Sequence, residues 1–152
     1  MAKNTVTTLV PKLITAEDTY VVRHKVLRKG RSIETCAFEG DTLSKTYHLG
    51  GYLGNKLVAV ASFYEVSNKE YTFNNAVQLR GMAVLENYHS NGYGQTLLKH
   101  GETLAKEKKY DILWMNARVS ALEFYTKQGY QKVGTIFEIP LVGDHFVLYK
   151  KI

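Results

Sequence analysis

The chain has 152 residues, of which 45% are hydrophobic and 22% are charged, the balance of an ordinary soluble globular protein. Its 20 Lys and Arg residues exceed its 14 Asp and Glu residues, and the resulting net charge of +6 suits an anionic ligand. The sequence has no run of about 18 apolar residues, so no membrane span is predicted. Residues 1–12 lack the apolar core of a signal peptide. Cys36 is the single cysteine, which excludes an internal disulfide and a cysteine-cluster metal site.

A positive charge would also suit nucleic acid. Basic residues gather at 23–31, 106–109 and 150–151, but the second group closes a predicted helix and the third is a chain terminus, where charges are usually solvated. The chain carries none of the common nucleic-acid-binding motifs. We therefore expect one domain over residues 1–152, located in the cytoplasm, with nucleic-acid binding disfavoured and no membrane partner.

The N-terminal part predicts a strand followed by a helix. Residues 5–14 are rich in Val, Thr, Leu and Ile, and Pro11 predicts that this strand is an edge or a broken one. Thr15 and Asp18 have the spacing of a capping box, so a helix is expected over about residues 16–27. Its mixed pattern predicts one apolar side and one basic side.

A polar segment and a hairpin come next. Residues 31–45 predict a long loop with about one helical turn, and long loops in compact domains are often functional, although a plain solvated loop is the alternative. The strand-like runs 46–51 and 56–66 flank Gly54-Asn55, which predicts a hairpin. The polar groups that the loop could supply to a site are those of Glu34, Cys36, Glu39 and Asp41.

The most informative stretch is a strand, a glycine turn and a helix. Residues 77–84 are apolar, residues 85–94 are polar with Gly92 and Gly94, and residues 95–109 repeat apolar residues with a helical period. A helix N-terminus presents unpaired N–H groups, and glycines before it let an anion touch the backbone. The unit therefore predicts a cradle for a phosphate or pyrophosphate, unless the glycines serve only the turn.

The C-terminal part predicts two further strands around a helix and a final hairpin. Residues 111–115 form an apolar run that ends at Asn116, and Ser120 is a plausible N-cap for a helix over residues 121–128. Gly129 is placed to close that helix. The last strand-like runs are residues 131–139 and 146–150. The alternation of strands and helices indicates a mixed α/β fold.

Two motifs resemble the GNAT superfamily of N-acetyltransferases. Residues 82–84 (MAV) followed by residues 89–94 (HSNGYG) resemble its acetyl-CoA-binding signature, Gln/Arg-x-x-Gly-x-Gly/Ala after an apolar strand. Asn116 and residues 121–130 (ALEFYTKQGY) resemble its later A-x-x-F-Y-x-x-x-G-F/Y pattern. The resemblance covers residues 77–150 well and the first half in outline. His89 departs from it, because the family usually has Gln or Arg there and the charge of histidine depends on pH.

The resemblance implies a GNAT fold of the mixed α/β class, with a mostly antiparallel central sheet, a splayed strand pair and helices on both faces. It implies an enzyme that transfers the acetyl group of acetyl-CoA to a primary amine of a small or amino-acid-like molecule. Residues 31–45 would form one wall of the acceptor groove. The residues implied to hold CoA are Met82, Ala83, Val84, His89, Ser90, Asn91, Gly92, Tyr93, Gly94, Gln95, Asn116 and Tyr125.

The same resemblance implies the catalytic residue. Tyr125 matches the family's tyrosine, and a phenol with a pKa of about 10 can protonate a thiolate without itself being ionised, although a core tyrosine is the plainer alternative. The general base stays open, with His145, Asp144, His48 and Glu34 as candidates and an already neutral amine with water as relay as the alternative. Glu34, Arg80 and His145 are candidate substrate contacts, with Arg80 suited to clamp an acidic group and His145 equally readable as a structural histidine.

One alternative belongs to another functional class, a GNAT-fold module that binds acyl-CoA without turnover, as a sensor or regulatory domain. The absence of a carboxylate in residues 77–84 and the presence of His89 favour it, whereas Tyr125 and Asn116 oppose it. Exposed strand edges would be compatible with a homodimer. Neither the acceptor amine nor the length of the acyl group follows from the sequence.

Overall fold

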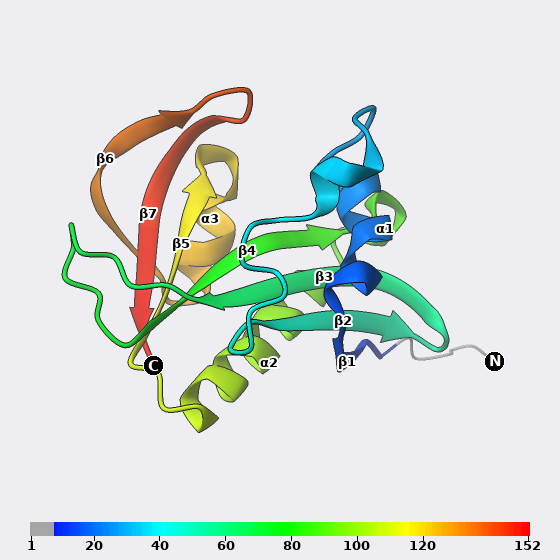
Figure 1. Cartoon of the computed structure of the whole chain (residues 1–152), viewed down its shortest axis with the longest axis horizontal. Coiled ribbons are helices and arrows are strands. Elements are labelled where there is room, and N and C mark those ends of the chain that lie inside the picture. The colour runs from blue at the N-terminus through cyan, green and yellow to red at the C-terminus, as the bar shows by residue number, and fades with distance from the viewer. Residues whose placement is uncertain (1–7) are drawn as a thin grey trace. The chain divides into compact units, whose positions relative to one another are not determined.

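The computed structural model describes residues 8–152, and its elements follow the order that the sequence predicts (Figure 1). Residues 5–7 of the first predicted strand lie outside the described residues. None of the described helices has the length and apolarity needed to cross a membrane. The elements are β1 Val10–Ile14, α1 Ala16–Val26, η1 Ile33–Cys36, β2 Tyr47–Leu53, β3 Lys56–Glu65, β4 Ala76–Val84, η2 Glu86–Tyr88, α2 Tyr93–Glu107, β5 Ile112–Arg118, η3 Val119–Ala121, α3 Leu122–Lys127, β6 Gln131–Ile139 and β7 Gly143–Lys151.

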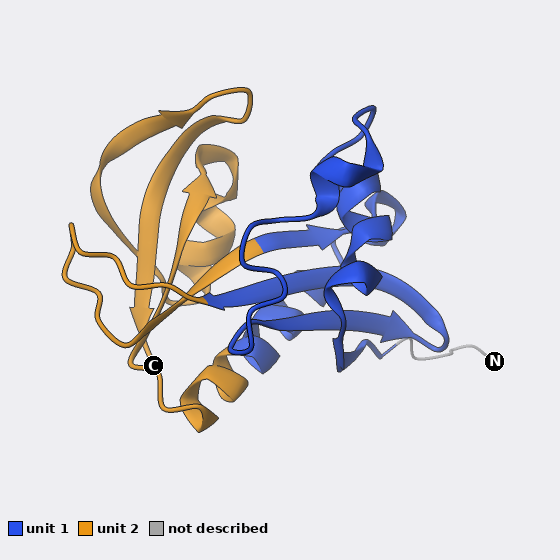
Figure 2. Ribbon diagram, in the orientation of Figure 1, with its two compact units in different colours: residues 1–64, 81–101 blue, residues 65–80, 102–152 orange. Residues whose placement is uncertain are grey.

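Contacts divide the chain into two compact units, coloured separately in Figure 2. The described part of unit 1 consists of residues 8–64 and 81–101, and unit 2 consists of residues 65–80 and 102–152. Strand β4 and helix α2 each contribute residues to both units. The expectation of a single domain over the whole chain stays a prediction.

The strands follow the order β1-β2-β3-β4-β5-β7-β6 in one seven-stranded sheet. The pairs β1/β2, β2/β3, β5/β7 and β6/β7 are antiparallel, whereas β4 and β5 are parallel. That parallel pairing covers three residue pairs only, from Ala76 opposite Ile112 to Gln78 opposite Trp114. The predicted mixed α/β class with a mostly antiparallel sheet is confirmed.

In unit 1 the two helices cover opposite faces of the strands. Val60 of β3 packs with Val22 of α1 on one face. On the opposite face Phe63 of β3 packs against Gly101 of α2. A Cβ atom on Gly101 of α2 would lie 2.1 Å from the Phe63 ring, so only glycine fits there. The Tyr47 ring stacks on Phe63 with centroids 4.8 Å apart. Strand alternation thus separates an α1 face from an α2 face.

Helix α1 begins as the capping box predicts. Asp18 N–H donates to Thr15 Oγ1, and Thr15 N–H donates to Asp18 Oδ2, both at 3.1 Å. The helix ends at Val26 with Leu27 as its C-cap, slightly earlier than expected. A reciprocal cap satisfies two of the four N–H groups that a helix start leaves unpaired.

The prediction of a basic side on α1 is wrong at Arg23, which is fully buried. Its guanidinium forms an ion pair with Asp41 at 2.7 Å and donates to the Cys36 carbonyl at 2.7 Å. It also donates to Ser62 Oγ at 2.9 Å and Tyr64 Oη at 3.2 Å. Consequently Cys36 and Asp41, two of the loop residues expected to face a substrate groove, are turned into the interior.

Burial and hydrogen bonding act in opposite directions on Asp41. Burial alone would raise the pKa of its carboxyl, but hydrogen bonds from Arg23, Tyr64 and the Phe38 N–H, with the charge of Arg23, outweigh it and hold the pKa below its usual value of 3.8. The Asp41 carboxylate therefore stays ionised throughout the physiological range and anchors the loop between η1 and β2.

Two boundaries near the predicted cofactor residues differ from expectation. Helix α2 begins at Tyr93, so Gly94 lies in its first turn instead of in the preceding loop. Strand β5 continues to Arg118, so Asn116 lies inside the strand instead of at its end. The helix starts before the glycine that the sequence pattern places in the loop, and pairing with β7 extends β5 past Asn116.

The C-terminal elements differ in a similar way. Ser120 is not an N-cap, because it lies in the 3₁₀ turn η3 and Ala121 precedes α3 without a side-chain cap. Strand β7 begins at Gly143, so Asp144 and His145 belong to the strand instead of the connection. Gly129 follows α3 with φ +97°, the left-handed conformation predicted for a closing glycine.

The core of unit 2 is aromatic. Phe73 and Trp114 are buried with ring centroids 6.2 Å apart, and Tyr149 lies 5.0 Å from Phe73. Tyr71 packs on the same cluster. Edge strand β6 breaks register with β7 after Val133.

Replacing Asp41 with Asn tests the buried ion pair. We expect the free energy of unfolding to fall by about 3–5 kcal/mol at neutral pH, because Arg23 is left as an uncompensated buried charge. A carboxyl whose folded pKa is lowered contributes stability above its unfolded pKa and loses it as pH falls through the folded value. In urea titrations the difference from wild type should therefore shrink below about pH 4.

The matched control is Glu123→Gln, which removes an exposed carboxylate that pairs with Lys127 at 3.5 Å. Its unfolding should change little at any pH, because exposed pairs contribute little. An Asp41→Asn variant as stable as wild type at neutral pH would contradict the role assigned to the pair.

Candidate active site

The loop before α2 gives unit 1 an exposed helix N-terminus. Ser90 and Gly92 have φ values of +66° and +78°, so the backbone turns sharply into the helix. Thr96 makes the first helical bond, donating from N–H at 3.0 Å and from Oγ1 at 3.1 Å to the Gly92 carbonyl. The N–H groups of a first helical turn have no acceptor inside the helix, and those of Gly94 and Gln95 are of this kind.

The space beside this turn is open. A Cβ atom built on Gly92 would meet no heavy atom within 4 Å. No acidic side chain lies in the first turn of α2, so nothing there neutralises the positive end of the helix dipole. The residues therefore fit the phosphate groups of CoA, since an anion can approach the backbone where a side chain at Gly92 would stand.

His89 and Asn91 hold this loop with their side chains. His89 Nε2 lies 2.7 Å from the Val84 carbonyl, which can only accept, so Nε2 carries the proton. Asn91 Nδ2 donates to the carbonyls of Tyr88 and His89 at 3.2 and 3.1 Å. The histidine that departs from the family signature thus ties the loop to the end of β4.

The end of β4 divides its side chains between two faces. Ala83 is buried against Val22 and Val60 on the α1 face. Met82 and Val84 are half-buried, and alternation places them on the other face. The backbone of this segment is therefore held from one face by α1.

The conformation of Gly81 in β4 is a structural feature that sequence patterns missed. Gly81 has φ +68° inside a strand, and a Cβ atom there would lie 3.1 Å from the Phe38 ring and 3.4 Å from Arg23 Nε. Arg23 Nε is also the buried side-chain polar atom that lacks a partner among residues 8–152. Phe38 lies over the Arg23 guanidinium at 4.0 Å, so the loop closes against the middle of β4.

In unit 2, Tyr125 projects from α3 and is 7% exposed. Burial raises the pKa of its phenol well above the ordinary value, which keeps the hydroxyl protonated at physiological pH. Its ring meets Phe124 and Tyr130 edge to face, at 5.0 and 5.9 Å. Within the described chain its hydroxyl has no hydrogen-bond partner, which leaves the proton available to a ligand.

A partly buried ion pair holds α3 in place. Lys150 Nζ lies 3.2 Å from both Glu102 carboxylate oxygens and donates to the Gln128 carbonyl at 3.0 Å. Tyr130 Oη donates to the same carboxylate at 2.6 Å. These contacts join the carbonyl end of α3 to β7 and so position the helix that carries Tyr125.

Asn116 is exposed on β5 and lies across from Val147 of β7. Leu113 pairs with Lys150, so the two side chains share one face of the β5/β7 pair. Lys150 contacts the end of α3 from that face. Because side chains alternate along a strand, Asn116 presents its amide on the opposite face from α3. Asn116 and Tyr125 therefore belong to different faces of the β5/β7 pair.

The three candidate substrate residues lie on separate elements. Glu34 is exposed on η1 in unit 1. Arg80 is half-buried on β4, in the part assigned to unit 2. His145 is 3% exposed on β7, with Nδ1 2.7 Å from the Gly143 carbonyl. Of these, His145 shares its strand face with Asn116, because its β5 partner is Arg118.

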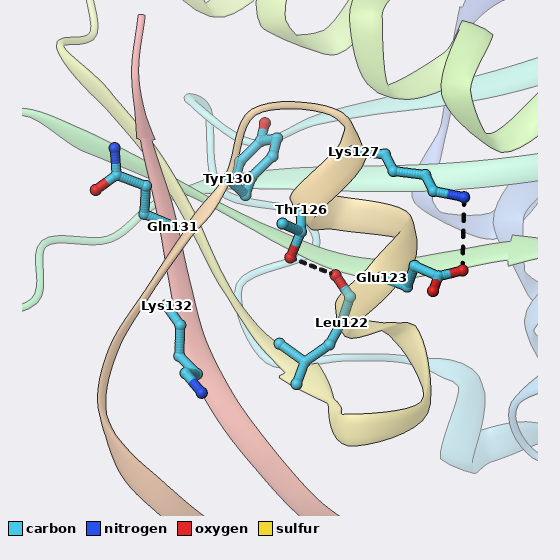
Figure 3. A pocket seen from close by; sticks show the side chains of 7 residues that line it. All are labelled: Leu122, Glu123, Thr126, Lys127, Tyr130, Gln131 and Lys132. Atoms are coloured by element: carbon cyan, nitrogen blue, oxygen red, sulfur yellow. Dashed lines mark hydrogen bonds and ion pairs between the residues drawn. The ribbon is translucent and has the colours of Figure 1, made fainter.

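Unit 2 also has a surface hollow of about 500 Å³ that lies apart from the candidate site residues (Figure 3). It contains no residue of the predicted site, and Figure 3 shows Lys127 and Lys132 pointing away from each other. Among residues 8–152 no group of His, Cys, Asp or Glu could hold a metal ion. The lining residues are Leu122, Glu123, Thr126, Lys127, Tyr130, Gln131 and Lys132.

Comparisons with known proteins point to one family and one fold. A family model described as the acetyltransferase (GNAT) family matches residues 15–130. YitI, an uncharacterized N-acetyltransferase of Bacillus subtilis, is 40% identical over 139 residues, covering 91% of this chain and 93% of the relative.

Two solved structures share the fold at low identity. The ribosomal-protein-S18-alanine N-acetyltransferase from Escherichia coli has a TM-score of 0.76 at 18% identity, covering 95% of this chain and 94% of that one. The PaiA N-acetyltransferase from Thermoplasma acidophilum, in complex with coenzyme A, has a TM-score of 0.71 at 17% identity, covering 95% and 99%.

Replacing Gly92 with Glu tests the anion cradle. The new carboxylate would occupy the open space and repel phosphate, so we expect the affinity for CoA to fall about 100-fold or more, since two charge-assisted hydrogen bonds of about 1.5–3 kcal/mol each would be lost. Isothermal titration calorimetry with CoA measures this change.

Gly54→Glu is the matched control. Gly54 lies in the turn between β2 and β3 with φ +58°, and a Cβ there also meets nothing within 4 Å. Both variants place the same charge on the same kind of strained backbone, so the Gly54 variant should bind CoA like wild type. Equal affinity of the Gly92 variant and wild type would remove the cradle from the site.

Proposed function

Because the chain belongs to the acetyltransferase (GNAT) family, we propose that it transfers the acetyl group of acetyl-CoA to a primary amine of a small or amino-acid-like acceptor. One observation carries this proposal, the open, positively polarised start of α2 beside Gly92. The coenzyme A complex of the PaiA structure supports the choice of cofactor for this fold.

The cofactor roles in unit 1 are mainly backbone roles. The N–H groups of residues 91–95 would hold the pyrophosphate, with His89 fixing the loop that presents them. Met82 and Val84 would contact the pantetheine and the acetyl end. In unit 2 the Asn116 amide would hydrogen-bond the pantetheine arm, which agrees with its exposure.

The proposed chemistry is direct transfer. Bound acetyl-CoA supplies the thioester, the neutral amine forms a bond to the carbonyl carbon, and the carbon–sulfur bond breaks with its electron pair on sulfur. Tyr125 Oη–H then donates a proton to that thiolate, and the proton that the nitrogen loses as the amide forms restores the Tyr125 phenol. Burial raises the pKa of the Tyr125 phenol, so its hydroxyl carries a proton at physiological pH.

The acceptor side is assigned to Glu34, Arg80 and His145. Arg80 would pair with an acidic group of the acceptor, because a guanidinium binds carboxylates in a bidentate way. Glu34 is exposed on the loop expected to wall the groove. A small amine that carries a carboxylate fits these groups best.

A module that binds acyl-CoA without turnover is the second candidate. The observation that favours it is the composition of β4, which carries no carboxylate over Ala76–Val84 to serve as a base. The unpartnered Tyr125 hydroxyl favours catalysis instead.

The deciding experiment compares thermal unfolding with and without acetyl-CoA and CoA, together with release of free thiol on a panel of amines. At about 100 times its dissociation constant a ligand that binds only the folded state adds roughly 2.7 kcal/mol. Cys36 is fully buried, so it should add little background to a thiol reagent. A shift with thiol release supports the enzyme, a shift without release on any amine supports the sensor, and no shift contradicts both.

Tyr125→Phe tests the general acid. Only the hydroxyl is removed, so we expect kcat to fall about 100-fold with little change in CoA affinity. Tyr130→Phe is the control, because its hydroxyl bonds Glu102 and its loss should lower stability without a comparable loss of turnover. A Tyr125→Phe enzyme as fast as wild type would place the acid elsewhere.

A further inference from the structure

The proposed function leaves the proton of the acceptor amine unassigned, and any assignment of the group that removes this proton rests on that function. Most primary amines arrive at neutral pH as ammonium ions, which have no lone pair for attack. A group of the protein that removes the proton must have an unoccupied lone pair and must lie beside the residues assigned to the acceptor and the cofactor arm.

Four carboxylates of the described chain are already engaged or turned away, which leaves Glu34 on η1 as the carboxylate assigned to the acceptor. Asp41 is committed to Arg23, and the Glu65 carboxylate accepts from Tyr110 Oη at 2.9 Å. Glu102 is held by Lys150. Asp144 is exposed next to His145, and strand alternation turns it to the other face of β7.

The histidines differ in which nitrogen is used. His48 has both occupied, with Nδ1 2.6 Å from Ser62 Oγ and Nε2 2.8 Å from the Asp41 carbonyl. His24 and His89 each give Nε2 to a backbone carbonyl, and both are exposed. His145 alone of these four is buried with Nδ1 as its only bonded nitrogen among the described residues.

The contact of His145 fixes its tautomer. The Gly143 carbonyl, 2.7 Å from Nδ1, can only accept, so Nδ1 carries the hydrogen. In the neutral ring the lone pair therefore lies on Nε2, which has no partner within residues 8–152. The backbone of β7 thus prepares Nε2 to accept a proton, as second partners of a catalytic imidazole commonly do.

The neighbours of His145 show that its imidazole lies on the strand face that also carries Asn116. On β5 its cross-strand partner is Arg118, two residues beyond Asn116 and on the same face. On β6 the Phe137 ring lies 5.9 Å away. Arg118 is the charged group that faces the imidazole, because the carboxylates of Glu138 and Asp144 pair in register on the opposite face and η3 carries none.

We propose that His145 Nε2 is the general base of the acetyl transfer. The N–H bond of the acceptor ammonium breaks, its electron pair stays on the amine nitrogen, and a new N–H bond forms at Nε2. The amine then attacks the thioester, and the imidazolium later returns its proton to solvent. The base therefore belongs to β7, whereas the acid Tyr125 belongs to α3.

His145→Asn is the decisive variant. The Asn side-chain amide can still donate to the Gly143 carbonyl, so a purely structural role would survive, whereas the lone pair of Nε2 is lost. At neutral pH we expect kcat/KM for the acceptor found on the amine panel to fall about 100-fold, with the thermal shift produced by acetyl-CoA unchanged.

Two readouts separate a base from a structural residue. In His145→Asn the acid limb of the pH profile of kcat/KM should move to higher pH and follow the ionisation of the acceptor amine, because activity then recovers only as the amine becomes neutral by itself. An acceptor of low basicity, already neutral at the assay pH, should lose much less. His100→Asn, a histidine on α2, is the control and should keep the wild-type profile.

Several outcomes would overturn the proposal. A folded His145→Asn variant with wild-type kcat/KM and pH profile would show a structural role only. If that variant does not fold, nitrogen-15 NMR of the wild-type imidazole decides, since a proton on Nε2 in the neutral ring excludes the base. Wild-type protein that binds acetyl-CoA but acetylates no amine at any pH refutes the proposed function, and the role of His145 as base with it.

Discussion

The ion pair of Arg23 with Asp41 is the interaction on which unit 1 most depends. It joins α1, the loop after η1 and strand β3 through one fully buried guanidinium. Breaking such a pair costs about 3–5 kcal/mol, a large share of the roughly 5–15 kcal/mol by which a domain is stable. Apolar residues in place of Arg23 and Asp41 could stabilise unit 1 equally well. Unlike apolar packing, the ion pair also has a fixed direction, and it therefore orients the loop that closes over β4.

The groups proposed in unit 1 and in unit 2 depend on different physical principles. In unit 1 the anion cradle is made by backbone N–H groups, and side chains such as His89 only hold the loop in shape. In unit 2 the reactive groups are side chains, Tyr125 and His145, whose protonation is set by burial and by one carbonyl contact. Substitutions should therefore be tolerated in the loop, except at Gly92, and poorly tolerated at the two side chains.

Much of this arrangement could be predicted from the sequence. Hydrophobic periodicity located the strands and helices, and the capping box of Thr15 and Asp18 marked the start of α1. Burial of Arg23 could not be predicted, because its partner Asp41 lies 18 residues away and arginine is usually exposed. The positive φ of Gly81 and the placement of His145 inside β7 depend likewise on tertiary contacts.

Strand β6 has a consequence for how this protein meets other molecules. It lies at one edge of the sheet, and its ladder is interrupted between Val133 and Phe137. The interruption is built around Gly134, with φ +77° and the Tyr71 hydroxyl where a side chain would stand. An edge kinked in this way offers a poor template for continuous strand addition. Tyr71 of the aromatic core thus helps to protect β6 against aggregation along this edge, although it lies far from β6 in the sequence.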